Sequence, residues 1–212
     1  MILGISGSPR SKGITASAIK EVLSNCVGET KYISLSGKQI AGCVSCLGCT
    51  KDNVCIIKDD FSKIAEAMRE AEAIVLGVPN YYNVPNVLSH ALLERSFCFR
   101  HQGIFGLQEK PIVILSTGYS SDEENSQVLN IVEHFANSNR MNVVSKFLVG
   151  AFSQCYSCKY GRTCVDGNIV KKNGLVDVVT SDMLPPKFDK QLEALDKCRN
   201  AAQLLNALSS AK

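Results

Sequence analysis

Five short apolar segments, separated by segments of helical periodicity, limit the fold of this chain more than any other feature. The apolar segments are 1–6, 31–35, 73–78, 111–117 and 142–149, and the helical patterns cover 16–26, a helix opened by residues 59–60, 87–99, 126–138 and 188–208. Strands that alternate with helices predict an α/β fold with a parallel, doubly wound sheet. A Gly/Ser loop directly after the first strand favours the flavodoxin-like strand order 2-1-3-4-5.

Length and composition fit one main domain with an appendage. We expect a flavodoxin-like domain over residues 1–150, and an extension over 151–212 whose closing helix packs on the same domain. The net charge of +3 is too small to indicate nucleic acid or an anionic membrane as a partner. Without a signal-peptide pattern, the ten cysteines are expected to be metal ligands or reduced thiols of a cytoplasmic protein.

The polar loop after the first strand has the composition of a phosphate site. A strand, a Gly/Ser loop and a helix start present backbone N–H groups and the positive end of the helix dipole to an anion. The loop has neither the P-loop motif nor the dinucleotide motif G-x-G-x-x-G, so a single terminal phosphate is favoured. Its candidate ligands are Ser8, Arg10, Ser11 and Thr15. The alternative is a strand-to-helix turn capped by a Ser or Thr side chain.

Two further loops are expected at the same edge of the sheet, because ligands bind at the carboxyl ends of parallel strands. The loop after the third strand offers two tyrosines between asparagines, and the loop after the fourth begins with Thr117. Together with the phosphate loop they fit FMN. The candidate ring contacts are Pro79, Asn80, Tyr81, Tyr82, Asn83 and Val84, with Thr117, Gly118 and Tyr119 near the far edge. The alternative is that the tyrosines only pack a helix entry.

Four cysteines lie in one long connection, residues 36–58. Cys43, Cys46, Cys49 and Cys55 have the spacing C-x2-C-x2-C-x5-C. Three thiols in steps of three are typical of a chain that wraps an iron–sulfur cubane. Structural zinc sites more often pair two C-x2-C units a dozen or more residues apart, and disulfides fit the expected compartment poorly. The connection is long for a structureless segment, and a bound cluster would order it.

A second group of cysteines follows the fifth strand. Cys155, Cys158 and Cys164 could supply three corners of a second metal site, but tetrahedral sites normally have four protein ligands. A fourth ligand would come from Cys26, Cys98, Cys198 or a carboxylate. The alternative is thiols that pack a C-terminal flap, with one disulfide formed in air. The segment 100–102, Arg-His-Gln, indicates only a surface or interface loop.

Three motifs together resemble a known family. SGSPRSKGIT, PNYYNVP and above all CVSCLGCTKDNVC followed by IIKDDF are similar to the iron–sulfur flavoproteins of anaerobic archaea and bacteria, in the NADPH-dependent FMN reductase-like branch of the flavodoxin fold. The resemblance covers roughly residues 1–150. It implies FMN and a [4Fe–4S] cluster in each subunit of a homodimer or homotetramer. By motif match it makes Cys43, Cys46, Cys49 and Cys55 the cluster ligands.

The resemblance also implies a direction for the chemistry. Electrons would pass from a one-electron donor such as ferredoxin through the cluster to FMN, and on to a small acceptor such as dioxygen or peroxide. No side chain is assigned a catalytic role, because the chemistry belongs to the cofactors. Two alternatives stay open: an NAD(P)H-dependent FMN or quinone reductase without a functional cluster, and a non-catalytic electron carrier or redox sensor.

Overall fold

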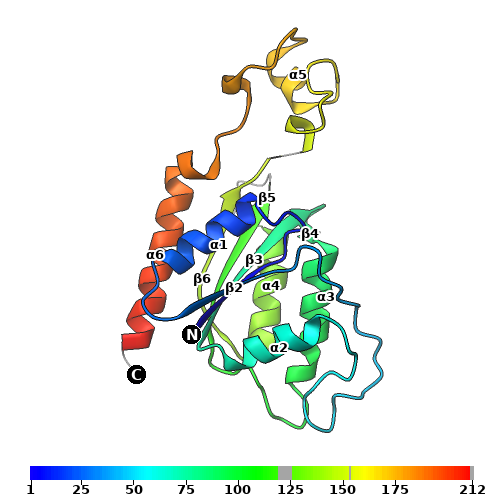
Figure 1. Ribbon diagram of the computed structural model, residues 1–212, viewed down its shortest axis with the longest axis vertical. Coiled ribbons are helices and arrows are strands. Elements are labelled where there is room, and N and C mark those ends of the chain that lie inside the picture. The colour runs from blue at the N-terminus through cyan, green and yellow to red at the C-terminus, as the bar shows by residue number, and fades with distance from the viewer. Residues whose placement is uncertain (119–125, 153, 211–212) are drawn as a thin grey trace.

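The computed structural model describes residues 1–118, 126–152 and 154–210, and its centre is a parallel sheet (Figure 1). The strand order β2-β1-β3-β5-β6 confirms the predicted flavodoxin-like order, because the short β4 pairs only with β3. Ile2 of β1 pairs with Thr30 of β2 on one side and with Ala73 of β3 on the other. The strands are β1 (Ile2–Ser6), β2 (Thr30–Ser34), β3 (Ala73–Tyr81), β4 (Val84–Pro85), β5 (Pro111–Gly118) and β6 (Asn142–Gly150).

Helices cover both faces of the sheet, as the continuously apolar strands predict. One core joins alternate strand residues such as Leu3 and Ile74 to α2 (Phe61–Glu70), α3 (Val87–Arg95) and α4 (Gln127–Ser138). The intervening strand residues, such as Val75, face α1 (Ile14–Ser24) and α6 (Leu192–Ser210). No helix in the described part of the chain is both long enough and apolar enough to cross a membrane.

The structure departs from the predicted elements at two places that matter for the site. The segment after the third strand is a hairpin rather than an irregular loop, since β3 continues to Tyr81 and pairs antiparallel with β4. The first helix begins at Ile14 after Gly13, and no side chain caps it, so the Ser- or Thr-capped turn does not form. Both differences lie at the carboxyl edge of the sheet.

Residues 154–187, which we call the arm, project from that edge before the chain returns to α6 (Figure 1). The arm holds one unpredicted short helix, α5 (Asn168–Asn173), and the single turns η2 (Gln154–Tyr156) and η3 (Ser181–Met183). Its packing is sparse: Ile169 is buried against Gly161, whereas Tyr160 and Leu175 are more than 70% exposed. The last turn, η4 (Phe188–Lys190), leads into α6.

A buried arginine closes the neck of the cysteine loop, residues 36–58. Arg95, at the end of α3, is 1% exposed and makes an ion pair with Asp59 at 2.7 Å. Its other N–H groups donate to the carbonyl oxygen of Ala41 at 3.0 Å and to that of Ile57 at 3.3 Å. One planar guanidinium therefore holds the entry and the exit of the loop together.

Asp59 is also held from the other side of the neck. Its carboxylate accepts N–H bonds from Ala41 at 3.0 Å and from Phe61 at 3.0 Å. Burial alone would raise the pKa of Asp59, but the hydrogen bonds from Arg95 and from these two N–H groups outweigh it, so the pKa is lowered. Its contribution to folding stability is therefore complete above about pH 4, near the unfolded-state pKa, and is lost as the pH falls through the folded-state pKa.

We expect Asp59→Asn to lower the free energy of unfolding at pH 7 by about 3–5 kcal/mol, because it leaves the buried Arg95 charge without its partner. The difference from wild type should begin to narrow below about pH 4 and should disappear as the pH falls through the lowered folded-state pKa, where the wild-type carboxylate is itself protonated. Urea titrations followed by far-UV circular dichroism at several pH values measure both effects. Glu66→Gln, on the exposed side of α2, is the matched control and should change stability little. An Asp59→Asn protein as stable as wild type at pH 7 would contradict this account of the neck.

Candidate functional site

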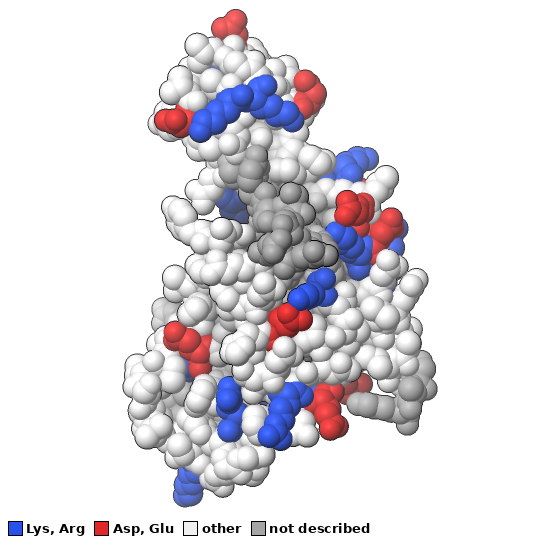
Figure 2. Space-filling model, turned by 180° about the vertical axis from the view of Figure 1, so that it is seen from behind, with Lys and Arg blue, Asp and Glu red and all other residues white. Residues whose placement is uncertain are grey.

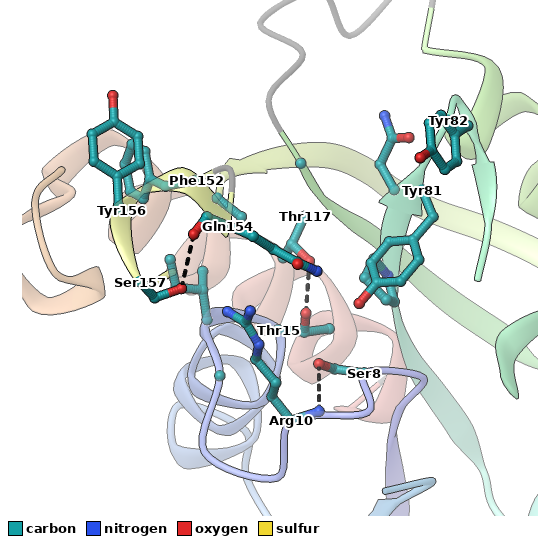
Figure 3. Close-up of a pocket in the computed structure, with 16 residues that line it drawn as sticks. Ser8, Arg10, Thr15, Tyr81, Tyr82, Thr117, Phe152, Gln154, Tyr156 and Ser157 are labelled. Carbon is teal, nitrogen blue, oxygen red and sulfur yellow. Dashed lines mark hydrogen bonds between the residues drawn. The ribbon is translucent and has the colours of Figure 1, made fainter. Parts of the chain in front are cut away.

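A cavity of about 620 Å³ lies at the carboxyl edge of the sheet (Figure 3). It is lined by four segments: the loop between β1 and α1, the β3–β4 hairpin, the end of β5, and the chain from the end of β6 into the start of the arm. All three loops that the sequence selected for FMN therefore meet at one cavity. The lining residues that were predicted are Ser8, Arg10, Thr15, Pro79, Asn80, Tyr81, Tyr82, Thr117 and Gly118.

The floor of the cavity carries the predicted phosphate loop. Ser8 and Thr15 are buried, and the Thr15 hydroxyl lies 2.6 Å from the Thr117 hydroxyl, which ties the start of α1 to the end of β5. Ser8 Oγ accepts the N–H of Arg10 at 3.1 Å. Because no side chain caps α1 at Gly13, its first-turn N–H groups are available to an anion. The floor thus combines hydroxyls, a guanidinium and a helix N-terminus.

Close packing against α3 shapes this loop. A Cβ on Gly7 would lie 1.9 Å from the hydroxyl oxygen of Ser89, so only glycine fits there. The carbonyl oxygen of Gly7 accepts a 2.9 Å hydrogen bond from the side chain of Asn86, which also caps α3. These contacts fix the path of the chain just before Ser8.

The tyrosine hairpin forms one wall. Tyr82 and Asn83 occupy the two central turn positions with φ of 56° and 62°, the pattern of a type I′ turn. Asn80 Oδ1 accepts the N–H of Asn83 at 2.8 Å and holds the turn. Tyr81 and the fully exposed Tyr82 thereby present aromatic rings at the mouth of the cavity (Figure 3).

The opposite wall comes from the chain beyond β6 and was not predicted. Phe152, Gln154, Tyr156 and Ser157 line it, facing the hairpin across the cavity (Figure 3). Phe152 and Tyr156 pack edge to face with ring centroids 6.2 Å apart. Ligands bind at the carboxyl ends of parallel strands, and this rule applies to the end of β6 at Gly150 as it does to the other strands. It could therefore have predicted this wall from the sequence.

Four predicted contacts are not placed in the lining. Ser11 is an exposed residue of the loop between β1 and α1. Asn83 occupies the turn of the hairpin, and Val84 of β4 pairs with Tyr81 of β3. Tyr119 lies outside the described residues.

The four cysteines of the cysteine loop carry free thiols in two environments. Cys43 and Cys46 are exposed, whereas Cys49 and Cys55 are half-buried. Cys49 Sγ lies 3.0 Å from His101 Nε2, and Arg95 Nε donates to Cys55 Sγ at 3.3 Å. Burial raises the pKa of Cys49, its own backbone N–H lowers it, and repulsion from the thiolates of the other three cysteines raises it further.

The backbone of the loop is tightly curved. Ser45, Leu47 and Asn53 have φ between 51° and 60°, in the left-handed region. A Cβ on Gly48 would lie 2.4 Å from the Ile56 side chain, so any larger residue would force Ile56 to shift where the loop folds on itself. The four cysteines therefore lie on a strongly curved segment of the backbone.

The donor set fits an iron–sulfur cluster by its chemistry: one loop carries four thiols that are not in disulfides, Arg95 Nε donates to Cys55 Sγ, and a ring nitrogen of His101 lies 3.0 Å from Cys49 Sγ. Within the described residues, no three His, Cys, Asp or Glu side chains are already arranged to hold a metal ion. Metal binding would therefore require the exposed Cys43 and Cys46 side chains to move toward Cys49 and Cys55.

The remaining cysteines separate into two kinds. Cys26, Cys98 and Cys198 pack in or against the two cores, and burial raises their pKa to about 11, 11 and 12. They lie apart from the arm and do not complete its cysteine group. In the arm, Cys158 Sγ contacts the carbonyl oxygen of Cys155 at 3.4 Å, while Cys164 is half-buried. The second metal site stays a prediction.

Charged side chains of both signs are interspersed on the face shown in Figure 2, and a band of basic side chains crosses the arm. The body of the protein on this face carries no continuous basic stripe of the kind that follows a nucleic-acid backbone.

Comparison with known proteins adds independent information. Residues 1–154 match the family described as NADPH-dependent FMN reductase. An iron–sulfur flavoprotein of Methanosarcina thermophila is 33% identical over 148 residues, covering 68% of this chain and 76% of that protein. An iron–sulfur flavoprotein of Methanocaldococcus jannaschii is 37% identical over 99 residues, covering 45% of this chain and only 51% of that relative.

Among solved structures, RosB with a bound riboflavin-5′-phosphate derivative superposes with a TM-score of 0.64 at 16% identity. The match covers 99% of this chain and 80% of RosB, and at this identity it shows the shared fold alone. The family match and the Methanosarcina relative decide membership: the chain belongs to the iron–sulfur flavoproteins, within the NADPH-dependent FMN reductase family.

Proposed function

We propose that the protein is a flavin-dependent oxidoreductase that binds FMN in the cavity and a [4Fe–4S] cluster on the cysteine loop. The observation that carries this proposal is the meeting of the uncapped start of α1, the Thr15–Thr117 hydroxyl pair and the tyrosine hairpin at one cavity of about 620 Å³. That volume lies within the range of cofactor pockets.

The floor of the cavity would hold the phosphate. The N–H groups at the start of α1 and the Thr15 hydroxyl donate hydrogen bonds, and the Arg10 guanidinium neutralises charge. The loop lacks the dinucleotide motif, so the proposal names FMN and not FAD.

The two walls of the cavity would enclose the ring. Tyr81 and Tyr82 offer aromatic faces from the hairpin, and Phe152 and Tyr156 do so from the chain beyond β6. Bound FMN supplies chemistry in steps of one or two electrons, which amino-acid side chains do not offer. The protein then contributes binding, orientation and exclusion of water.

The cysteine loop would supply four thiolates to the cluster, with Cys49 and Cys55 on its buried side. The resemblance supports ferredoxin or a similar one-electron donor, a small acceptor such as dioxygen or peroxide, and a homodimer or homotetramer. A cytoplasmic location is proposed with them. Absence of iron and acid-labile sulfide from protein reconstituted anaerobically would favour the alternative of an FMN or quinone reductase without a cluster.

The flavin released by heat should be FMN, and Thr15→Val should weaken its binding. Losing one hydrogen bond to a charged phosphate costs about 1.5–3 kcal/mol, which is roughly a tenfold to 150-fold increase in Kd. Titration of apoprotein with FMN, followed by flavin fluorescence, measures the change.

Ser11→Ala is the matched control, because Ser11 is exposed beside the same loop and does not line the cavity. Its FMN affinity should stay within about twofold of wild type, since an exposed hydroxyl beyond the lining offers little binding energy. Release of mainly FAD, or equal affinities for wild type and Thr15→Val, would refute the phosphate assignment.

Cys46→Ser should lose or degrade the cluster while FMN stays bound, because the cavity and the cysteine loop use different residues. Iron and sulfide analysis together with the anaerobic visible spectrum report both cofactors. Reduction of FMN by reduced ferredoxin should collapse, whereas reduction by dithionite should survive.

Cys158→Ser replaces an equally exposed cysteine in the arm and is the matched control. It should retain four iron atoms per chain, the content of one [4Fe–4S] cluster. An intact cubane signal in Cys46→Ser would overturn the ligand assignment. Metal beyond four irons that disappears in Cys158→Ser would instead identify the second site.

A further inference from the structure

The segment that closes α3, residues 95–102, contacts the cysteine loop at several points. The neck residue Arg95 reaches Cys55, and His101 reaches Cys49. These are the two half-buried cysteines of the four. The sequence of the segment 100–102 indicates only a surface or interface loop, and the structure places His101 and Gln102 directly against the cysteine loop.

His101 is held in place by contacts on both sides. Its backbone N–H donates to Asn53 Oδ1 at 2.7 Å, and its carbonyl oxygen accepts from Asn53 Nδ2 at 3.3 Å. Its ring packs edge to face on Phe97, with centroids 5.6 Å apart. The next residue, Gln102, donates to the carbonyl oxygens of Thr50 and Lys51 at 2.6 and 3.0 Å. The imidazole is therefore fixed toward the sulfur of Cys49.

The chemistry of a ligating sulfur decides which partner donates in each of these two hydrogen bonds. A thiolate bound to iron has no proton and offers only lone pairs, so its partner must be the donor. Arg95 Nε always carries a hydrogen, and His101 Nε2 must carry one to approach a thiolate at 3.0 Å. Hydrogen bonds to cluster sulfurs stabilise the more negatively charged, reduced form and so raise the reduction potential.

We propose that His101 and Arg95 are positioning residues of the cluster, whose N–H groups bind the sulfurs of Cys49 and Cys55 and raise its reduction potential. This inference rests on the proposed function, because it requires a cluster on the cysteine loop. Each donor is assigned to the sulfur within its hydrogen-bond distance, His101 to Cys49 and Arg95 to Cys55. This assignment also distinguishes the four cysteines: Cys49 and Cys55 would receive donors from the segment 95–102, whereas Cys43 and Cys46 are exposed.

The test uses holoprotein reconstituted anaerobically, with a redox titration of the cluster followed by electron paramagnetic resonance. His101→Phe removes the donor and keeps a ring against Phe97. It should lower the reduction equilibrium constant of the cluster about tenfold, equivalent to about 59 mV for one electron. His101→Gln retains an N–H donor and should stay within about threefold of wild type. His134→Phe, on the exposed side of α4, is the matched control and should leave the potential unchanged.

A second measurement detects the contact with His101 in the wild-type protein itself. In wild-type protein labelled with ¹⁵N-histidine, pulsed electron paramagnetic resonance of the reduced cluster should show coupling to one histidine nitrogen. That coupling should vanish in His101→Gln, which has no imidazole.

Two failures are distinguishable. If wild type binds four irons but shows no histidine coupling, or if His101→Phe keeps both its cluster and its potential, this inference is overturned and the proposed function survives. If wild type retains FMN but forms no cluster, both the inference and the cluster in the proposed function are overturned.

Discussion

A parallel sheet brings the carboxyl ends of all its strands to one edge, and this constraint decides where the cavity lies. The ends of β1, β3, β5 and β6 are far apart in the sequence, yet each contributes to the lining. The buried Thr15–Thr117 hydroxyl pair joins residues 102 positions apart and couples the start of α1 to the end of β5. The cavity is therefore a property of the strand order, and local side chains only adjust it.

Periodicity in the sequence predicts much of this architecture, because both faces of the sheet are buried. Segments such as 73–78 are apolar throughout, and the helices between them show one apolar face each, so the strands and their order follow. The phosphate and ring loops were predicted for the same reason, since a strand end fixes where its loop must lie. The hairpin was not, because its turn is Tyr82-Asn83 rather than one of the glycine-containing pairs that usually indicate a type I′ turn.

What the sequence does not reveal are contacts between distant segments with no shared pattern. In the sequence, Arg95 is indistinguishable from an exposed charged residue of a helix. Only the folded chain shows it buried against Asp59, 36 positions away. His101 meets Cys49 across 52 positions for the same reason. The second wall of the cavity belongs to a loosely packed arm whose composition lacks clear periodicity. Prediction failed where tertiary contacts, and not local preference, set the position of a side chain.

The closed neck has a consequence for how the cysteine loop can move. Gln39 and Asp60 exchange hydrogen bonds at 2.8 and 3.1 Å, and Arg95 joins Ala41 to Ile57. Protein groups make all of these contacts, so the entropic cost of bringing the two ends of the loop together belongs to the folding of the domain. A rearrangement of the cysteines then concerns only the residues between the two ends. The loop can change its conformation there while the neck stays closed.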